Sequence, residues 1–337
     1  MGDFFNLIRA WHGAVAEGII WSVMTLGVYI TFRILDFPDL SVDGSFVTGG
    51  AVAAMFVAYL NVNPFLALLA SLAAGMLCGL ITGFINTKMK IPGILSGIIT
   101  MTALYSINFR IMNNSSTVAL IGTNTVDVVV RDFFRGISAV NAQLIIGGVL
   151  ALALIAFLYW FFGTELGSSI RATGNNPHMA RSLGINTDST VMVALMLSNG
   201  LVALSGGVFA HVQGSSSLSS GPGTIAIGLA SVIIGEVVLG KKLGFILRLS
   251  AMVVGTVIYR LIFATVLFAG LKATDMKLIS ALVVCFALYL PTARKRFVSW
   301  QTRKRGRVPQ LGLVPDAVME DIIDGSDKDP DEPNLHD

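Results

Sequence analysis

Three carboxylates lie close together between two apolar runs near the start of the chain. The connecting stretch reads LDFPDLSVDGSF over residues 35–46 and also carries two serine hydroxyls. If the flanking runs cross a membrane, such groups are costly to bury and are typical of a route for ions or polar solutes. A turn outside the membrane is the alternative, because Pro38 and Gly44 suit a turn equally well. The residues predicted to line a route are Asp36, Asp39, Ser41, Asp43 and Ser45.

Other charged side chains interrupt apolar runs elsewhere in the chain. Glu236 stands close to a pair of lysines, so its carboxylate could line the route or extend to the membrane surface. Arg33 is the nearest basic residue to Asp36 and Asp39 and is the candidate partner for either carboxylate. Arg260 lies in the middle of an apolar run and requires a partner that the sequence does not identify.

The long polar segment 164–189 contains signals for a short helix. Asn176 can cap that helix and Pro177 can begin it, while Gly184 can end it. A short rigid helix of this kind is something that a motor subunit could push against, although an ordinary amphipathic loop would look similar. The residues available to cap the following membrane helix are Asp188 and Ser189.

Motifs for several other chemistries are absent. The chain has no GxxxxGK[S/T] phosphate-binding loop, so it is not expected to hydrolyse ATP. It has no HExxH motif and no paired cysteine and histidine cluster, and Cys78 and Cys285 both lie inside apolar runs. An enzyme that works within the membrane would need a catalytic pair, and no such constellation is convincing. The sequence therefore predicts no catalytic residue, no metal and no cofactor.

The elements that position these groups are membrane helices. The chain has 337 residues, of which 54% are hydrophobic and 13% charged, and its mean hydropathy is +0.76. Soluble domains carry about 25% charged residues, and a helix needs about 20 apolar residues to span a bilayer. We expect an all-α polytopic membrane protein of about 8–10 transmembrane helices, short or re-entrant segments included. The long apolar runs are 13–35, 64–87, 93–112, 141–163, 190–212, 245–269 and 276–292, and two shorter runs are 46–60 and 224–240.

The run 46–60 leaves the side of the N-terminus open. If it crosses fully, Met1 lies outside the cell, and if it is re-entrant, Met1 lies inside. The re-entrant interpretation is preferred, because the run is short and its approach is polar. Residues 1–12 would then form a segment at the membrane interface, with a short helix over 3–12.

Basic residues gather in alternate connections, as expected for the cytoplasmic side. The connections at 88–90, 164–189 and 241–248 are basic, and the loop at 113–140 contains only two arginines. This pattern predicts a transmembrane domain over 13–293. A tail over 294–337, basic and then acidic, is predicted to be disordered in the cytoplasm.

The order of residues in the loop resembles one protein family closely. The pattern G..IRA.G.NP..ARS.GIN, from Gly167 to Asn186, is similar to the cytoplasmic loop of bacterial ATP-binding cassette importer permeases, the superfamily of branched-chain amino acid and ribose permeases. The segments around Ser198 and Asn199 and around 226–235 also fit, and the stretch over 35–46 resembles a narrower subgroup linked to amino acids, aromatic ones included. The resemblance covers residues 13–295. It implies that the coupling residues are Arg171, Gly174, Asn176, Pro177, Ala180, Arg181, Gly184 and Asn186, and that Ser198 and Asn199 join the route.

Such a family implies several partners. They are a second copy of the chain, a cytoplasmic ATP-binding cassette subunit, and an extracytoplasmic binding protein that delivers a small polar solute. The location would be the bacterial inner membrane, with the C-terminus in the cytoplasm and no nucleic-acid partner. The alternative is a secondary transporter driven by an ion gradient, in which Asp36, Asp39, Asp43 and Glu236 carry protons or Na⁺.

Overall fold

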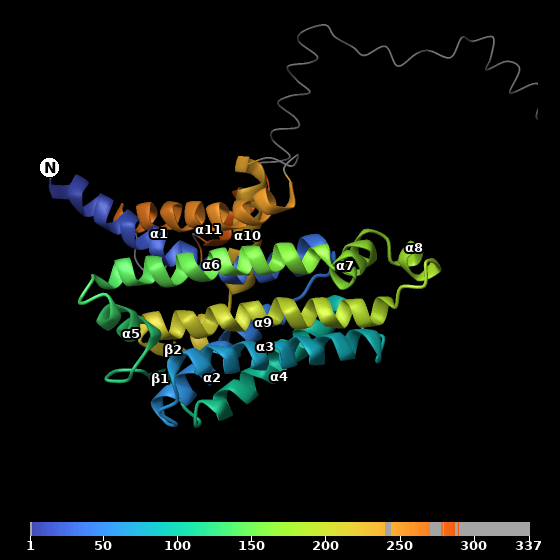
Figure 1. The fold of residues 1–337 in the computed structure, drawn as a ribbon, viewed down its shortest axis with the longest axis horizontal. Coiled ribbons are helices and arrows are strands. Elements are labelled where there is room, and N and C mark those ends of the chain that lie inside the picture. Colours follow the sequence, from blue (N-terminus) through green and yellow to red (C-terminus); the bar gives the residue numbers. More distant parts are fainter. Residues whose placement is uncertain (1, 240–243, 270–277, 279, 287–288, 290–337) are drawn as a thin grey trace, which may run out of the picture. The chain divides into compact units, whose positions relative to one another are not determined.

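The structure is a computed structural model, in which residues 2–239, 244–269, 278, 280–286 and 289 are described. Nearly all of them are helical (Figure 1). The elements in chain order are α1 (Gly2–Tyr29), the π-helical turn η1 (Ile30–Ile34), α2 (Val42–Ala58), α3 (Pro64–Thr87), α4 (Gly93–Ile111), β1 (Thr117–Ala119), α5 (Val126–Phe133), α6 (Ala139–Gly163), α7 (Glu165–Asn175), α8 (Pro177–Ser182), α9 (Thr187–Gln213), β2 (Ser215–Ser217), the 3-10 turn η2 (Leu218–Ser220), α10 (Thr224–Leu239) and α11 (Phe245–Phe268).

Within the described residues, seven helical segments are long and apolar enough to cross a membrane. The predicted all-α polytopic fold is confirmed. Six of the predicted long runs coincide with α1, α3, α4, α6, α9 and α11, and the two shorter runs coincide with α2 and α10. The predicted run 276–292 falls mostly outside the described residues, and the tail 294–337 falls entirely outside them.

The two ends of the helix bundle differ in structure (Figure 1). One end, here called the strand end, carries α5 and the antiparallel pair of β1 and β2, in which Thr117 faces Ser217. The other end, here called the α8 end, carries α7 and α8. The helix α9 runs from the α8 end to the strand end. It lies antiparallel to α1, because Ser198 Oγ donates to Gly27 O at 2.7 Å and Ser205 Oγ donates to Ile20 O at 3.3 Å.

The course of the chain through residues 35–58 differs from the preferred prediction. The helix α1 begins at the strand end, and η1 brings the chain to the α8 end. The chain then turns at Asp36, where φ is +55°, and α2 runs from the middle of α9 to the strands. Between residues 35 and 58 the chain therefore passes from the α8 end of the bundle to the strand end. The re-entrant interpretation of 46–60, in which the chain returns to the same end, is wrong. The polar stretch before this run does not need to stay in water, because its carboxylates and hydroxyls form hydrogen bonds inside the bundle. Residues 3–12 are the first turns of α1 at the strand end, not a helix of their own.

Close backbone approach holds α2 and α3 against α9. A Cβ atom added to Gly49 would lie 1.8 Å from the carbonyl oxygen of Ala203, and one added to Gly75 would lie 2.3 Å from that of Asn199. Both positions therefore require glycine. Small residues at helix contacts are the usual means of tight packing in lipid. As a consequence, α9 is the central helix against which α1, α2 and α3 pack.

An aromatic cluster joins α1, α2 and α9. The ring of Trp21 stacks on Phe46 with centroids 5.2 Å apart and meets Phe209 edge-on at 5.4 Å. Phe46 and Phe209 are 5.8 Å apart. Offset and edge-on arrangements of this kind are favourable beyond the area that the rings bury. The cluster fixes the first turn of α2 against α1 and α9.

Candidate functional site

A closed hydrogen-bond network ties the stretch before α2 to the middle of α9. The Asp39 carboxylate accepts from the backbone N–H of Ser41 at 2.9 Å, from Ser41 Oγ at 2.5 Å and from Asn199 Nδ2 at 2.8 Å. The amide oxygen of Asn199 accepts from Ser41 Oγ at 3.2 Å and from Ser45 Oγ at 2.6 Å. The network thus uses both ends of one asparagine amide to hold one carboxylate and two hydroxyls.

The members of this network are completely buried. Asp39, Ser41, Ser45 and Asn199 each have 0% of their surface exposed. The neighbouring Ser198 is equally buried and bonds to the backbone of α1. Solvent does not reach them in this conformation, so their place on a transport route stays a prediction. Their observed effect is to fix the start of α2 at mid-depth.

Asp43 caps a helix that lies far away in the sequence. Its carboxylate accepts from Gly223 N at 3.0 Å, from Thr224 Oγ1 at 2.7 Å and from Ile225 N at 2.9 Å. These donors form the first turn of α10, whose free N–H groups and positive dipole end favour a carboxylate. The two short helices α2 and α10 are therefore joined at their N-terminal ends.

The remaining predicted carboxylates lie towards the α8 end. Asp36 is exposed. Glu236, near the end of α10, forms an ion pair with Arg33 in η1. Arg33 is therefore not the partner of Asp36 or Asp39, and that prediction is wrong. The correction has a physical cause, because neutral hydrogen-bond donors satisfy the Asp39 carboxylate, while the side chains of Arg33 and Glu236 meet each other.

The predicted short helix in the polar segment is present as α8. Asn176 caps it, since its side chain accepts from Met179 N at 3.0 Å, and Pro177 is its first residue. It ends before Gly184, where φ is +82°. Ala180 is its buried residue. The local signals were sufficient here because each acts within one turn.

The cap of α9 differs from the prediction. Asn186 is the capping residue, and its side-chain oxygen accepts from the backbone N–H groups of Asp188 and Ser189, each at 3.2 Å. Asp188 and Ser189 are therefore the capped residues and not the caps. The side chain of Asp188 faces two cations instead, at 3.5 Å from Lys90 Nζ and 3.5 Å from Arg181 Nη2.

The sequence analysis did not predict the helix α7. Its cap is Thr164, whose hydroxyl accepts from Gly167 N at 3.3 Å, and Glu165 occupies its first turn. A threonine followed by an acidic residue is a recognised start signal for a helix. The signal was available, but the glycines and serines that follow obscured it.

The helix α7 is fixed to two parts of the membrane bundle. A Cβ atom on Gly174 would lie 1.9 Å from the carbonyl oxygen of Ile34, so α7 touches the end of η1 directly. Thr173 and Thr190 share a hydrogen bond at 2.9 Å, which links α7 to α9. Arg181 Nε donates to Thr187 Oγ1 at 2.6 Å and links α8 to the start of α9. The loop is thus connected to η1 and to α9.

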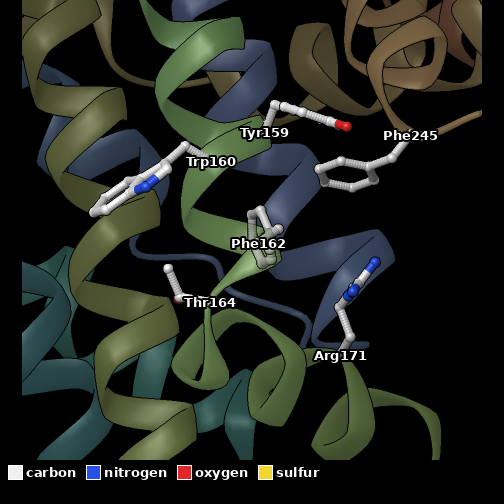
Figure 2. Close-up of a pocket in the computed structure, with 7 residues that line it drawn as sticks. Tyr159, Trp160, Phe162, Thr164, Arg171 and Phe245 are labelled. Atoms are coloured by element: carbon white, nitrogen blue, oxygen red, sulfur yellow. The ribbon is translucent and has the colours of Figure 1, made fainter.

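A pocket of about 420 Å³ opens beside α7 (Figure 2). It is bounded by the end of α6, with Trp160, Phe162 and Thr164, and by Phe245 at the start of α11. Figure 2 shows the side chain of Arg171 extending from α7 towards Phe245, and its guanidinium carbon lies 5.7 Å from the centre of that ring. The predicted residue Arg171 is therefore held by an aromatic side chain at the α8 end.

A second charged group inside the bundle was only partly foreseen. Arg260 Nη1 pairs with Glu17 Oε1 at 3.1 Å, and its guanidinium carbon lies 4.2 Å from the centre of the Trp21 ring. The partner that Arg260 was expected to require is therefore Glu17. It is 243 residues away, and nothing near either residue in the sequence indicates the pair. His211 is also buried, and neither ring nitrogen has a hydrogen-bond partner among the described residues.

The chain is similar in sequence to known transport proteins. Residues 13–288 match the family described as the branched-chain amino acid transport system permease component. The tyrosine transport system permease protein of Clostridioides difficile (strain R20291) is 40% identical over 275 residues, which cover 80% of this chain and 87% of that protein. The ribose import permease protein RbsC of Escherichia coli (strain K12) is 24% identical over 299 residues, covering 88% and 87% of the two chains.

One solved structure is also similar. It is PsaBC from Streptococcus pneumoniae in complex with Fab, which matches 82% of this chain and 89% of that chain at 14% identity with a TM-score of 0.44. That likeness is too weak to support a conclusion. The family match and the C. difficile relative carry the assignment of the family.

Proposed function

Because the chain belongs to the family of permease components of branched-chain amino acid transport systems, we propose that it forms the membrane half of an ATP-driven importer for an amino acid. A cytoplasmic ATP-binding cassette subunit would supply the energy, and an extracytoplasmic binding protein would deliver the solute. Two copies of the chain would form the permease. The α8 end would face the cytoplasm of a bacterial cell, because the cations Lys90, Arg171 and Arg181 gather there.

The exposed face of α8 is the observation that carries this proposal. Met179 is 51% exposed and Leu183 is 69% exposed, although both are apolar and lie at the end of the bundle beyond the membrane helices. A rigid helix that presents apolar side chains to water is typical of a surface that another protein covers. The ATPase subunit is the partner that the family supplies at this place.

The internal contacts offer a physical connection from α8 to mid-depth. Displacement of α8 would act on α9 through Arg181 and Thr187, and α9 carries Asn199. Asn199 holds the start of α2, and Asp43 in turn holds the start of α10. A chain of packed and hydrogen-bonded elements of this kind can couple two distant sites if it has two stable arrangements.

An aromatic amino acid is the proposed solute. The support is the relative from C. difficile, which is named for tyrosine transport and covers most of this chain. The binding protein would hold much of the selectivity, so the solute needs a direct measurement. Uptake of radiolabelled tyrosine, phenylalanine, leucine and ribose by cells that express the complete transporter would order these candidates.

The test of the function is co-purification in mild detergent. The variant Met179→Asp/Leu183→Asp changes the exposed face of α8 and leaves the internal contacts of α8 in place. The matched control is Ile121→Asp/Phe133→Asp, which makes the same kind of change at apolar residues of the strand end that are 89% and 80% exposed. We expect the ATPase subunit to co-purify with the wild type and the control, and to be lost with the α8 variant together with ATP-driven uptake.

The competing transporter class gives a different result. A secondary transporter would purify without an ATPase and would accumulate solute in proteoliposomes along a proton or Na⁺ gradient. That outcome would disprove the importer proposal. Asp36, Asp39, Asp43 and Glu236 would then be the residues to replace first.

A further inference from the structure

Arg171 is a cation without an ionic partner in the part of the chain that the structure describes. Its guanidinium forms no ion pair and no side-chain hydrogen bond there, and it lies over the ring of Phe245. Arg181 on the neighbouring helix α8 differs, because it pairs with Asp188 and donates to Thr187. A guanidinium offers five N–H donors in a planar fork that matches a phosphate or a carboxylate. Arg171 is therefore equipped to bind an anion that the described chain does not supply.

The pocket of about 420 Å³ beside α7, here called the α7 pocket, gives this cation a concave surrounding. In Figure 2 the side chain of Tyr159 extends from α6 towards Phe245, and Arg171 extends towards the same ring from α7. The Tyr159 hydroxyl has no hydrogen-bond partner among the described residues, so it is a second free donor. None of the residues that line the pocket is acidic, and Glu165, which follows Thr164 in the sequence, is not one of them. The pocket therefore favours an anion.

The α7 pocket lies where a membrane helix ends. The helix α6 is long and apolar enough to span a bilayer, and the pocket is formed at its last two turns. Tyr159 is 52% exposed and Trp160 is 65% exposed in these turns. Tyrosine and tryptophan are enriched at the level of the lipid headgroups, because one part of each side chain is apolar and another is polar. The pocket is therefore open at the depth where phospholipid phosphates lie.

Apolar side chains continue from the pocket along both membrane helices. Leu152 and Phe157 are exposed on α6, and Ile246 and Leu247 are exposed in the first turn of α11. A free inorganic anion would make no use of this surface, and a protein in the cytoplasm would not reach it. Lipid tails pack against such side chains because both are apolar. The surroundings therefore favour an anion that carries acyl chains.

We propose that the α7 pocket binds the phosphate of an anionic phospholipid, held by donors from Arg171 and Tyr159, with its acyl chains along α6 and α11. The guanidinium forms charge-assisted hydrogen bonds to the phosphate. Basic pockets between membrane helices recognise anionic headgroups in this way. A zwitterionic lipid carries its own ammonium group beside the phosphate, so it gains less from Arg171. The inference goes beyond the proposed function and requires only that α6 spans the membrane.

Native mass spectrometry of the full-length chain in detergent tests the site, because it counts the lipids bound to each molecule. The protein is titrated with phosphatidylglycerol and, separately, with phosphatidylcholine of the same acyl chains. The variant Arg171→Gln removes the charge from the pocket. Arg181→Gln makes the same change of charge at the same end of the bundle and is the matched control. Unfolding midpoints in detergent alone establish that each variant is folded.

We expect wild type and Arg181→Gln to bind phosphatidylglycerol about ten-fold more tightly than phosphatidylcholine. Arg171→Gln should lose this preference, and Arg171→Lys should keep part of it because the charge remains. If wild type shows no preference, or Arg171→Gln keeps it in full, the proposal is overturned. Arg171 would then be left with the coupling role that the family resemblance implies. The measurement involves neither ATP nor uptake, so it decides the question even if the chain is not part of an ATP-driven importer.

The second donor is tested by Tyr159→Phe, which removes only the hydroxyl. Affinity for phosphatidylglycerol should fall about three-fold, since one neutral hydrogen bond is lost, and affinity for phosphatidylcholine should change less. Tyr105→Phe, at an exposed position on α4, is the control and should have no effect. An unchanged affinity in Tyr159→Phe would overturn the assignment of this hydroxyl to the site.

Thermal unfolding in detergent distinguishes a lipid from a free phosphate. Phosphatidylglycerol should raise the unfolding midpoint of wild type and not that of Arg171→Gln, because a ligand stabilises the folded state to which it binds. Millimolar inorganic phosphate should raise neither midpoint. If inorganic phosphate stabilises wild type as much as the lipid does, and does not stabilise Arg171→Gln, the pocket takes a soluble anion and the assignment to a lipid is overturned.

Discussion

At the scale of the residue, Asn199 is the group on which the mid-depth network depends. Its Nδ2 donates to Asp39 and its Oδ1 accepts from Ser41 and Ser45, so one side chain satisfies three others in the absence of water. A buried carboxylate that loses a donor is penalised more heavily than an exposed one. The network is therefore a point at which a single substitution has a large effect.

Replacement of Asn199 by alanine should lower the stability of the protein. The variant Asn199→Ala removes one donor to the Asp39 carboxylate and the acceptor of two hydroxyls, and we expect a loss of about 2 kcal/mol. Thermal unfolding in detergent, followed by a thiol-reactive dye on Cys78 in a Cys285→Ser background, would measure a midpoint several degrees lower. Asn141→Ala on the exposed start of α6 is the control and should be neutral. An unchanged midpoint for Asn199→Ala would show that the network contributes little.

Asp127 at the strand end gives stability a pH dependence. Burial raises the pKa of its carboxyl, and the neighbouring Arg131, at 3.4 Å, opposes that rise without cancelling it. The folded protein therefore holds this proton to a higher pH than the unfolded chain does. The free energy of unfolding falls as pH rises from the ordinary pKa of an aspartate through the raised value, and it stays lower above that value.

The variant Asp127→Asn should be less sensitive to pH over that range. We expect the unfolding midpoint of the variant, relative to wild type, to rise as the pH is increased from about 4 to 7. Midpoints measured at several pH values in the same detergent would test this. A difference between the two proteins that is constant with pH would mean that Asp127 does not titrate abnormally.

At the scale of the element, α7 connects the polar loop to the membrane helices. Its contact with η1 leaves no space for a side chain at Gly174, and its hydrogen bond to Thr190 joins α9. The segment is thus held on two sides. Any change that lifts α7 away from η1 should disturb α8 as well, because only Asn176 separates the two helices.

The variant Gly174→Ala should therefore uncouple the loop without unfolding the bundle. Its methyl group would meet the Ile34 carbonyl, so α7 must shift, and we expect uptake and solute-stimulated ATPase activity to fall together. The amount of protein in the membrane should be close to that of wild type. Gly148→Ala on α6, where the added atom meets nothing within 4 Å, is the control. Full activity in Gly174→Ala would rule out a tight contact there.

At the scale of the whole molecule, the direction of α1 places the first residues at the strand end. The same end carries α5 and the paired strands, and the opposite end carries the cations around α8. In the proposed orientation the strand end faces outwards. This assignment gives every connection in the described chain a definite side.

Labelling of single cysteines would test that assignment in intact cells. In the Cys285→Ser background, His12→Cys and Ser219→Cys should react with an impermeant maleimide added outside. Ser182→Cys in α8 should react only after the membrane is permeabilised. All three parent residues are exposed, so access through the membrane is the main variable. Reaction of Ser182→Cys in intact cells would reverse the proposed orientation.

The sequence was informative where signals are local and uninformative where partners are distant. Asn176, Pro177 and Gly184 fixed α8 correctly because capping acts within one turn. The pairs Arg33 with Glu236 and Glu17 with Arg260 could not be predicted, since they join residues more than two hundred positions apart. The predicted side of the N-terminus depended on whether one short run crosses, and the sequence carried no local signal for the distant partners that let α2 cross.

The cap that Asp43 places on α10 has a consequence for how the chain is made. The carboxylates of Asp39 and Asp43 emerge early from the ribosome, whereas their partners Asn199 and Ile225 follow 160 and 182 residues later. At about 5–20 residues per second, that interval lasts roughly ten to thirty seconds. During this time the first short helix has a charged start and no protein to receive it. Its release into lipid must therefore wait for the second half of the chain, or depend on an insertion factor that shields it.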